Sequence, residues 1–202
     1  MAFIQVSAGT LLAPVPAVLV TVGREREGKT ETNLLTIAWA GTVCSEPPMV
    51  SVSVRKERYS HDFIVESGEF VINLTGRSLL KATDFCGVCS GRDVDKFAAC
   101  KLTQVPAQGM RFAPAIAESP LYLSCKVVNA LPLGSHTMFV GQIEAVGVRD
   151  DLMDQTGRID FSKADLVAYN HGIYYALGDA LGFFGYSVAA PDVLKRRMNG
   201  LK

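Results

Sequence analysis

Valine and serine alternate from position 50 to position 54, and Arg55 follows directly. A period of two is typical of a strand that buries one of its faces. A second apolar run, Leu34 to Trp39, precedes it, and the bend Ser45–Pro48 lies between the two runs. We therefore predict two strands that follow each other in the chain and are separated by a proline-containing bend.

The rest of the chain also favours short strands. Apolar or alternating runs predict strands at Ala17–Val22, Glu69–Leu74, Leu121–Val128 and Thr137–Val148, and short strand or loop elements at Ala164–Ala168 and Ile173–Leu177. The charged segment Gly23–Thr32 predicts a hairpin tip. Short helices are predicted at Ser60–Ser67, Leu79–Phe85 and Asp93–Cys100, with a break at Cys86–Gly91, a surface segment at Gln104–Ala117 and a short exposed helix or frayed end at Pro191–Lys202.

This pattern predicts a mainly β protein of the α+β type, a barrel or sandwich with short decorating helices. No shift in composition marks a boundary, so residues 1–202 are predicted to form a single domain.

The corner between Arg55 and Ser60 is the first candidate site. Serine is a favoured helix N-cap, and the start of a helix presents free N–H groups to an anion. A strand that ends in arginine and leads into a serine-capped helix forms a plausible phosphate cradle. An ordinary strand–loop–helix corner with a solvated Arg55 is the alternative, and the local pattern leaves both open.

Composition limits the classes of protein. The chain has 202 residues, of which 49% are hydrophobic and 20% charged, and its formal net charge is zero, as expected of a folded globular protein without a nucleic-acid partner. The apolar run Leu11–Val22 contains two prolines and is too short to span a bilayer, so no membrane partner is expected. No signal peptide is evident, and the five cysteines are an odd number. We therefore predict a cytoplasmic protein with reduced thiols.

Several short motifs, taken in order, resemble the flavin reductase-like family. They are Asn33 with Thr36–Trp39, then Ser45–Pro48, Val50–Arg55, Tyr59–His61 and Gly68–Leu74. Each motif is common by itself, and their order and spacing carry the resemblance, which runs from about Pro16 to Phe184 and is closest to the flavoredoxin branch. The resemblance implies the FMN-binding split β-barrel fold, FMN as cofactor and a homodimer with the flavin near the subunit interface.

The resemblance also assigns roles to residues. Backbone groups of Thr36, Ile37, Ala38 and Trp39 would hydrogen-bond the edge of the flavin ring. The ribityl chain and phosphate would meet Ser53, Val54 and Arg55, with Tyr59, Ser60 and His61 at the next corner. Apart from the resemblance, Lys96 is a second candidate cation for the phosphate. The loop that closes over the flavin would contain Asp84, Phe85, Cys86, Gly87 and Ser90.

For two aromatic residues, Trp39 and His136, a structural role is an alternative to a role at the flavin. Trp39, the single tryptophan, could equally be a core or interface aromatic. His136 matches a family histidine near the nicotinamide side of the ring, but Ser135 stands where the family has an aspartate. The resemblance therefore carries no acid–histidine pair over, and a structural role for His136 stays open.

The Cys86-x-x-Cys89 motif could be a redox dithiol or half a metal site. No second such motif occurs, and Cys44, Cys100 and Cys125 lack metal-ligand spacing. A structural or backbone role is therefore expected, and neither a metal site nor a catalytic side chain is predicted.

The resemblance predicts a redox flavoprotein that holds FMN non-covalently and transfers electrons to or from a partner protein, with the flavin carrying the chemistry. An NAD(P)H-dependent flavin reductase, an oxidoreductase that reduces and releases free flavin, is one alternative. A non-catalytic module that binds a phosphorylated ligand is the other.

Overall fold

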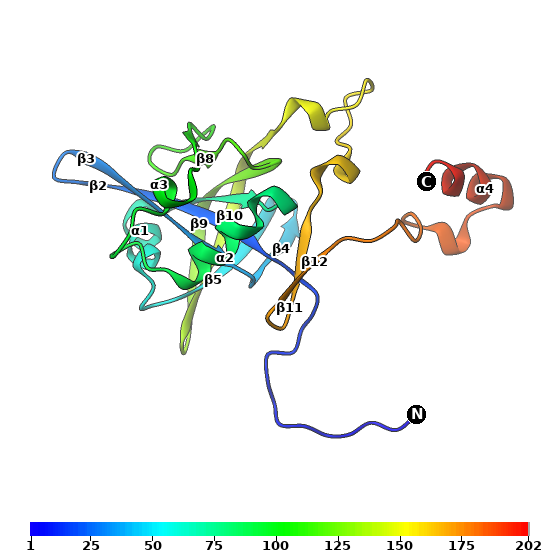
Figure 1. Cartoon of the computed structure of the whole chain (residues 1–202), viewed down its shortest axis with the longest axis horizontal. Helices are drawn as coiled ribbons and strands as arrows, with labels where there is room; N and C mark the ends of the chain where they lie inside the picture. The colour runs from blue at the N-terminus through cyan, green and yellow to red at the C-terminus, as the bar shows by residue number, and fades with distance from the viewer. Residues whose placement is uncertain (202) are drawn as a thin grey trace.

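The computed structural model describes residues 1–201 (Figure 1). Its largest element is a seven-stranded sheet in the order β3-β2-β6-β9-β10-β5-β4, and every neighbouring pair in it is antiparallel. The strands are β2 (Val18–Arg26), β3 (Lys29–Ile37), β4 (Ala40–Ser45), β5 (Pro48–Arg55), β6 (Glu69–Leu74), β9 (Leu121–Leu133) and β10 (His136–Val148). The predicted mainly β fold with short helices is confirmed.

Smaller elements surround this sheet. A three-stranded sheet contains β1 (Val15–Pro16), β11 (Val167–Asn170) and β12 (Ile173–Ala176), and a two-stranded sheet pairs β7 (Gln104–Val105) with β8 (Ala115–Ile116). The α-helices are α1 (Tyr59–Ser67), α2 (Leu80–Val88), α3 (Lys96–Cys100) and α4 (Pro191–Asn199). Single 3₁₀ turns are η1 (Arg77–Leu79), η2 (Asp150–Leu152), η3 (Phe161–Ala164) and η4 (Tyr186–Val188).

The main core lies between the sheet and α1. The valines at 50, 52 and 54 are buried, whereas the intervening serines are half-buried, as the alternation predicts. They pack with Phe63 and Ile64 of α1 and with Phe70 and Phe139 of the sheet, all of them almost completely buried. Burial of these large apolar side chains supplies most of the driving force for folding.

Two details of the predicted helices are wrong. Ser60 is not the N-cap of α1: the helix begins at Tyr59 after Arg58, which makes no side-chain cap. Ser60 is buried in the first turn, where its hydroxyl accepts a hydrogen bond from the Asn33 side chain at 2.9 Å. The chain also does not break at Cys86, because α2 continues to Val88 and only Cys89 adopts an extended conformation.

Other segments are more ordered than predicted. The tip of the first hairpin is only Glu27-Gly28, with φ of 52° and 74°, the left-handed pair that a two-residue hairpin loop needs. Strand β4, which no apolar pattern indicated, forms an edge of the sheet. Within the predicted surface segment 104–117, Ala113 and Ala115 are buried against the sheet.

Both ends of the chain leave the main body (Figure 1). Residues 1–13 form neither helix nor strand, and large apolar side chains such as Phe3 are fully exposed there. After β12 the chain runs away from the sheets to α4, which has no buried residue, and Phe184 on the way is also fully exposed. Among the described residues, no helix has the length and apolarity that a membrane span requires.

Candidate functional site

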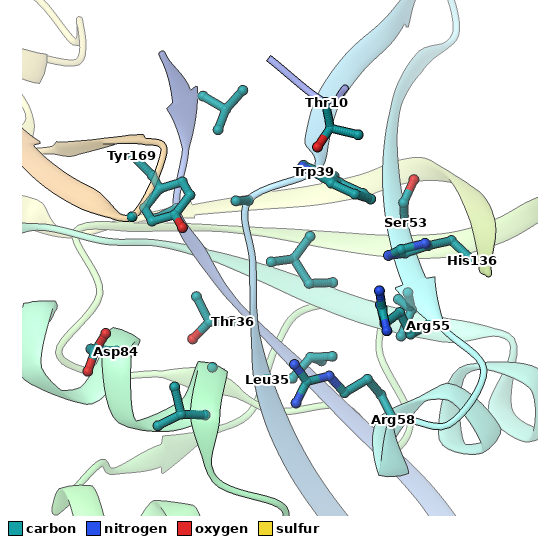
Figure 2. A pocket seen from close by; sticks show the side chains of 18 of the residues that line it. Thr10, Leu35, Thr36, Trp39, Ser53, Arg55, Arg58, Asp84, His136 and Tyr169 are labelled. Atoms are coloured by element: carbon teal, nitrogen blue, oxygen red, sulfur yellow. The ribbon is translucent and has the colours of Figure 1, made fainter. Parts of the chain in front are cut away.

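A pocket of about 700 Å³ opens where the end of β3, strand β5, helix α2 and the β11–β12 hairpin meet (Figure 2). Residues from five regions of the chain line it. The β3–β5 region contributes Leu35, Thr36, Ile37, Ala38, Trp39, Ser53, Val54, Arg55 and Arg58, and α2 contributes Asp84, Gly87 and Val88. The remaining lining residues are Thr10, Leu12, Val15 and Ala17, which precede β2, His136 of β10, and Tyr169, His171, Gly172 and Tyr174 of the hairpin.

Strand β3 presents free backbone groups to this pocket. It is an edge strand, paired only with β2 within the seven-stranded sheet. The Leu34 carbonyl points away from that sheet, because it accepts a hydrogen bond from the Lys96 ammonium at 2.9 Å. Residues two apart in a strand point their backbone groups to the same side, so the Thr36 N–H and C=O also face outward. The pocket wall thus offers a donor and an acceptor side by side.

One end of the pocket, the end at Arg55 and Arg58, is cationic. Figure 2 shows Arg55 and Arg58 at the end of the pocket farther from Tyr169 and Asp84. Arg55 forms an ion pair with Glu57 at 3.2 Å, and both side chains are more than half exposed. Because such exposed pairs contribute only about 0–1 kcal/mol, Arg55 remains free to bind an anion.

A second cavity of about 310 Å³ adjoins this cationic end and shares Leu35, Arg55 and Arg58 with the main pocket. Arg92 and Lys96 also line it. The guanidinium of Arg92 lies over the Tyr59 ring, 5.1 Å from its centroid. Four cationic side chains therefore gather around the two connected cavities.

Trp39 and His136 form a tilted aromatic pair at the pocket wall, with ring centroids 4.7 Å apart. Trp39 is 45% exposed, so it lies outside the core. The Nδ1 atom of His136 lies 2.9 Å from the Ser135 hydroxyl. Partial burial and then the charge of Arg55 lower the pKa of His136, and Glu57 opposes them. The imidazole is therefore mainly neutral at pH 7.

The structure brings together most of the predicted site residues. Nine of them line the main pocket: Thr36, Ile37, Ala38, Trp39, Ser53, Val54, Arg55, Asp84 and Gly87. Tyr59, Ser60, Ser90 and Lys96 line the smaller cavity next to it.

Three predicted residues do not line these two cavities. His61 of α1 lies with its Nε2 atom 3.0 Å from the Thr137 hydroxyl. Phe85 and Cys86 pack in a second core cluster with Leu34, on the side of α2 away from the pocket. Any contact of these two with a ligand would involve the backbone of α2 rather than their side chains.

The Lys96 side chain is almost completely buried. Its ammonium donates to the Leu34 carbonyl at 2.9 Å and to the Cys86 carbonyl at 3.0 Å, and burial lowers its pKa. The predicted second cation therefore joins β3 to α2 at the back of the site.

Sequence reasoning missed several lining residues, above all Arg58, Tyr169, His171 and Tyr174. The hairpin residues lie more than a hundred positions beyond β5, and their weak signal was a tyrosine-rich segment. Arg58 was missed because the N-cap was predicted at Ser60, two residues after the observed N-cap, which is Arg58 itself.

All five cysteines are free thiols, and burial raises the pKa of Cys86 to about 12. Within residues 1–201 no group of three or more His, Cys, Asp or Glu side chains is arranged to hold a metal ion. A buried thiol with so high a pKa is a poor nucleophile at neutral pH.

The fold and this pocket define a flavin reductase-like protein. The family model "Flavin reductase like domain" matches residues 11–177, so the chain belongs to this family, as the resemblance predicts. Flavoredoxin of Desulfovibrio vulgaris (Miyazaki F) is similar in structure, with a TM-score of 0.83, 33% sequence identity, and coverage of 93% of this chain and 99% of that one. Flavoredoxin from Methanosarcina acetivorans has a TM-score of 0.80 and 31% sequence identity, and the match covers 91% of this chain and 95% of that one. The predicted split-barrel fold is confirmed.

Two further proteins are similar in sequence. An uncharacterised protein of Archaeoglobus fulgidus is 31% identical over 150 residues, which is 74% of this chain and 81% of that protein. The reductase component of 4-nitrophenol 4-monooxygenase/4-nitrocatechol 2-monooxygenase from Rhodococcus opacus is 30% identical over 108 residues, 54% of each chain.

Proposed function

We propose that this protein holds FMN non-covalently in the main pocket and transfers electrons to or from a partner protein. One observation carries the proposal: the free edge of β3 and the cationic end at Arg55 and Arg58 belong to the same pocket of about 700 Å³. A flavin mononucleotide needs both features, since its ring edge is polar and its phosphate is anionic.

The donor set fits that cofactor. The outward Thr36 backbone groups match the alternating donors and acceptors of a flavin pyrimidine edge, and Trp39 and Val88 provide apolar wall. Arg55 and Arg58 would hold the phosphate by charge-assisted hydrogen bonds. Bound FMN would supply the hydride and electron chemistry. The protein residues bind and orient the ring, and the neutral His136 leaves no extra positive charge beside it at pH 7.

A reductase that reduces flavin with NAD(P)H and releases it is the second candidate. The similarity to the reductase component from Rhodococcus opacus favours it. The similarity to two flavoredoxins, over more than 90% of this chain, favours the electron carrier.

We further propose a homodimer of single-domain subunits in the cytoplasm. The exposed apolar side chains of both chain ends, including Phe3, Ile4, Leu181 and Phe184, support a second copy as their cover. The five free thiols support a reducing compartment. Light scattering over a range of concentrations tests the dimer, and a monomer at every concentration would contradict it.

Desalting the protein after loading with FMN tests the function. We expect the visible flavin spectrum to stay with the protein, and NADH or NADPH added without oxygen to bleach it slowly or not at all. Colourless protein that accelerates reduction of free flavin would favour the reductase, and absence of any flavin binding would refute both candidates.

A further inference from the structure

The β11–β12 hairpin forms the wall of the pocket opposite the cationic end (Figure 2). Its two-residue loop, His171-Gly172, has φ of 45° and 90°, the left-handed pair that suits the twist of a tight hairpin. Tyr169 and Tyr174 pair across the strands with ring centroids 5.2 Å apart, and both line the pocket with the loop.

The base of this hairpin is fixed to the body. The Val167 N–H donates to the Thr75 carbonyl at 3.2 Å, and Arg77 forms an ion pair with Asp165 at 3.1 Å. Strand β11 is also paired with β1, through Tyr169 with Val15 and Ala168 with Pro16. The base and strand β11 therefore have several attachments.

Strand β12, on the other side of the hairpin, is attached differently. The Tyr174 hydroxyl donates to the Asp84 carboxylate of α2 at 3.3 Å. Within residues 1–201, no other side-chain hydrogen bond joins the hairpin to α2. Burial and the Asp84 charge raise the pKa of Tyr174, so the phenol keeps its proton and remains a donor over the neutral range. Because Asp84 and Tyr174 both line the pocket, this bond closes its side between helix and hairpin.

We propose that the β11–β12 hairpin is a latched wall that retains the flavin, and that the Tyr174–Asp84 hydrogen bond is the latch. The inference rests on the proposed function and adds to it the element that sets how long FMN stays bound. With the latch made, the hairpin stays against α2 and a ligand must leave past it. With the latch open, the hairpin is held by its base and by the pairing of β11 with β1, and the β12 side of the hairpin is free to move away from α2 and open the side of the pocket.

Neighbouring tyrosines provide a matched pair of variants. Tyr174→Phe removes the donor and keeps the ring, whereas Tyr175→Phe makes the same change on the other face of β12, where the side chain is 48% exposed and outside the pocket. Dilution of the FMN complex into flavin-free buffer, followed by recovery of free-flavin fluorescence, gives the dissociation rate. We expect a rate about three- to tenfold higher for Tyr174→Phe, since the lost bond joins a charged acceptor but is partly exposed.

Asp84→Ala removes the acceptor and should raise the rate similarly, and the double variant should add little more because both changes break one bond. Hydrogen exchange of residues 167–176 in flavin-free protein gives a second readout. We expect faster exchange for Tyr174→Phe and wild-type exchange for Tyr175→Phe.

If Tyr174→Phe releases FMN at the wild-type rate, the hairpin does not retain the flavin, whatever the hydrogen exchange of residues 167–176 shows. Wild-type exchange in that variant overturns the latch itself. If even the wild-type protein fails to bind FMN, the proposed function fails, and the exchange experiment still decides whether the latch exists.

Discussion

Replacing Arg55 with alanine should weaken binding of FMN and leave binding of riboflavin almost unchanged. Riboflavin has the same ring and ribityl chain without the phosphate, so the difference between the two ligands isolates the contact with the anion. Arg55 lines the main pocket and the smaller cavity, and its side chain is 54% exposed.

The size of the effect follows from that exposure. Hydrogen bonds to charged groups contribute about 1.5–3 kcal/mol, and solvent screening together with the competing carboxylate of Glu57 favours the lower end. A loss of about 1.5 kcal/mol corresponds to about a tenfold higher Kd for FMN. Arg58 remains as a second cation, so binding should be weakened rather than abolished.

Titration of flavin fluorescence against each protein gives both Kd values. Lys56→Ala is the matched control, because it removes an exposed neighbouring cation that lines neither cavity. Equal loss of FMN and riboflavin affinity in Arg55→Ala would show that the residue supports the pocket rather than the phosphate. An unchanged FMN affinity would refute the cationic-end assignment altogether.

Two further predictions concern packing and titration. Gly141→Ala should destabilise the protein by about 1–3 kcal/mol in urea unfolding, because the added methyl would lie 2.6 Å from a buried phenylalanine ring; Gly41→Ala, with no atom within 4 Å, is its control. For His136, NMR titration should give a pKa below the usual value, raised by Arg55→Ala and lowered further by Glu57→Gln. Because folding lowers this pKa, the contribution of His136 to the free energy of unfolding is full above about pH 6.5 and is lost as the pH falls through the folded-state pKa. A His136 pKa at its usual value, unchanged by both substitutions, would contradict this prediction.

Elements with a strong local pattern could be predicted from the sequence. The valine–serine alternation gives β5 and its buried face, and Gly68 ends α1 in the left-handed conformation that glycine favours. These features depend on a few consecutive residues, so the chain itself contains the required information.

Elements whose state depends on distant neighbours could not be predicted. Ser60 has the side chain of an N-cap, but its hydroxyl bonds the Asn33 side chain, which is 27 residues away. Strand β4 has little apolar pattern because it is an edge strand with mostly exposed side chains. The pocket wall around Tyr174 forms only when the last strands fold back over α2, a tertiary arrangement that local periodicity does not encode.

Lys96 shows how the surroundings change a role that charge alone suggests. A buried ammonium is costly unless its donors are satisfied, and here the carbonyls of Leu34 and Cys86 accept two of its hydrogen bonds. Leu34 belongs to β3 and Cys86 to α2, and these two elements carry Thr36 and Gly87, which lie next to each other in the lining of the same pocket: a Cβ on Gly87 would come 3.4 Å from the Thr36 Cβ. Contact of Lys96 with a phosphate stays a prediction. The hydrogen bonds to the two carbonyls already give the charge a structural consequence, because they join β3 to α2, the two elements that meet at this part of the pocket lining.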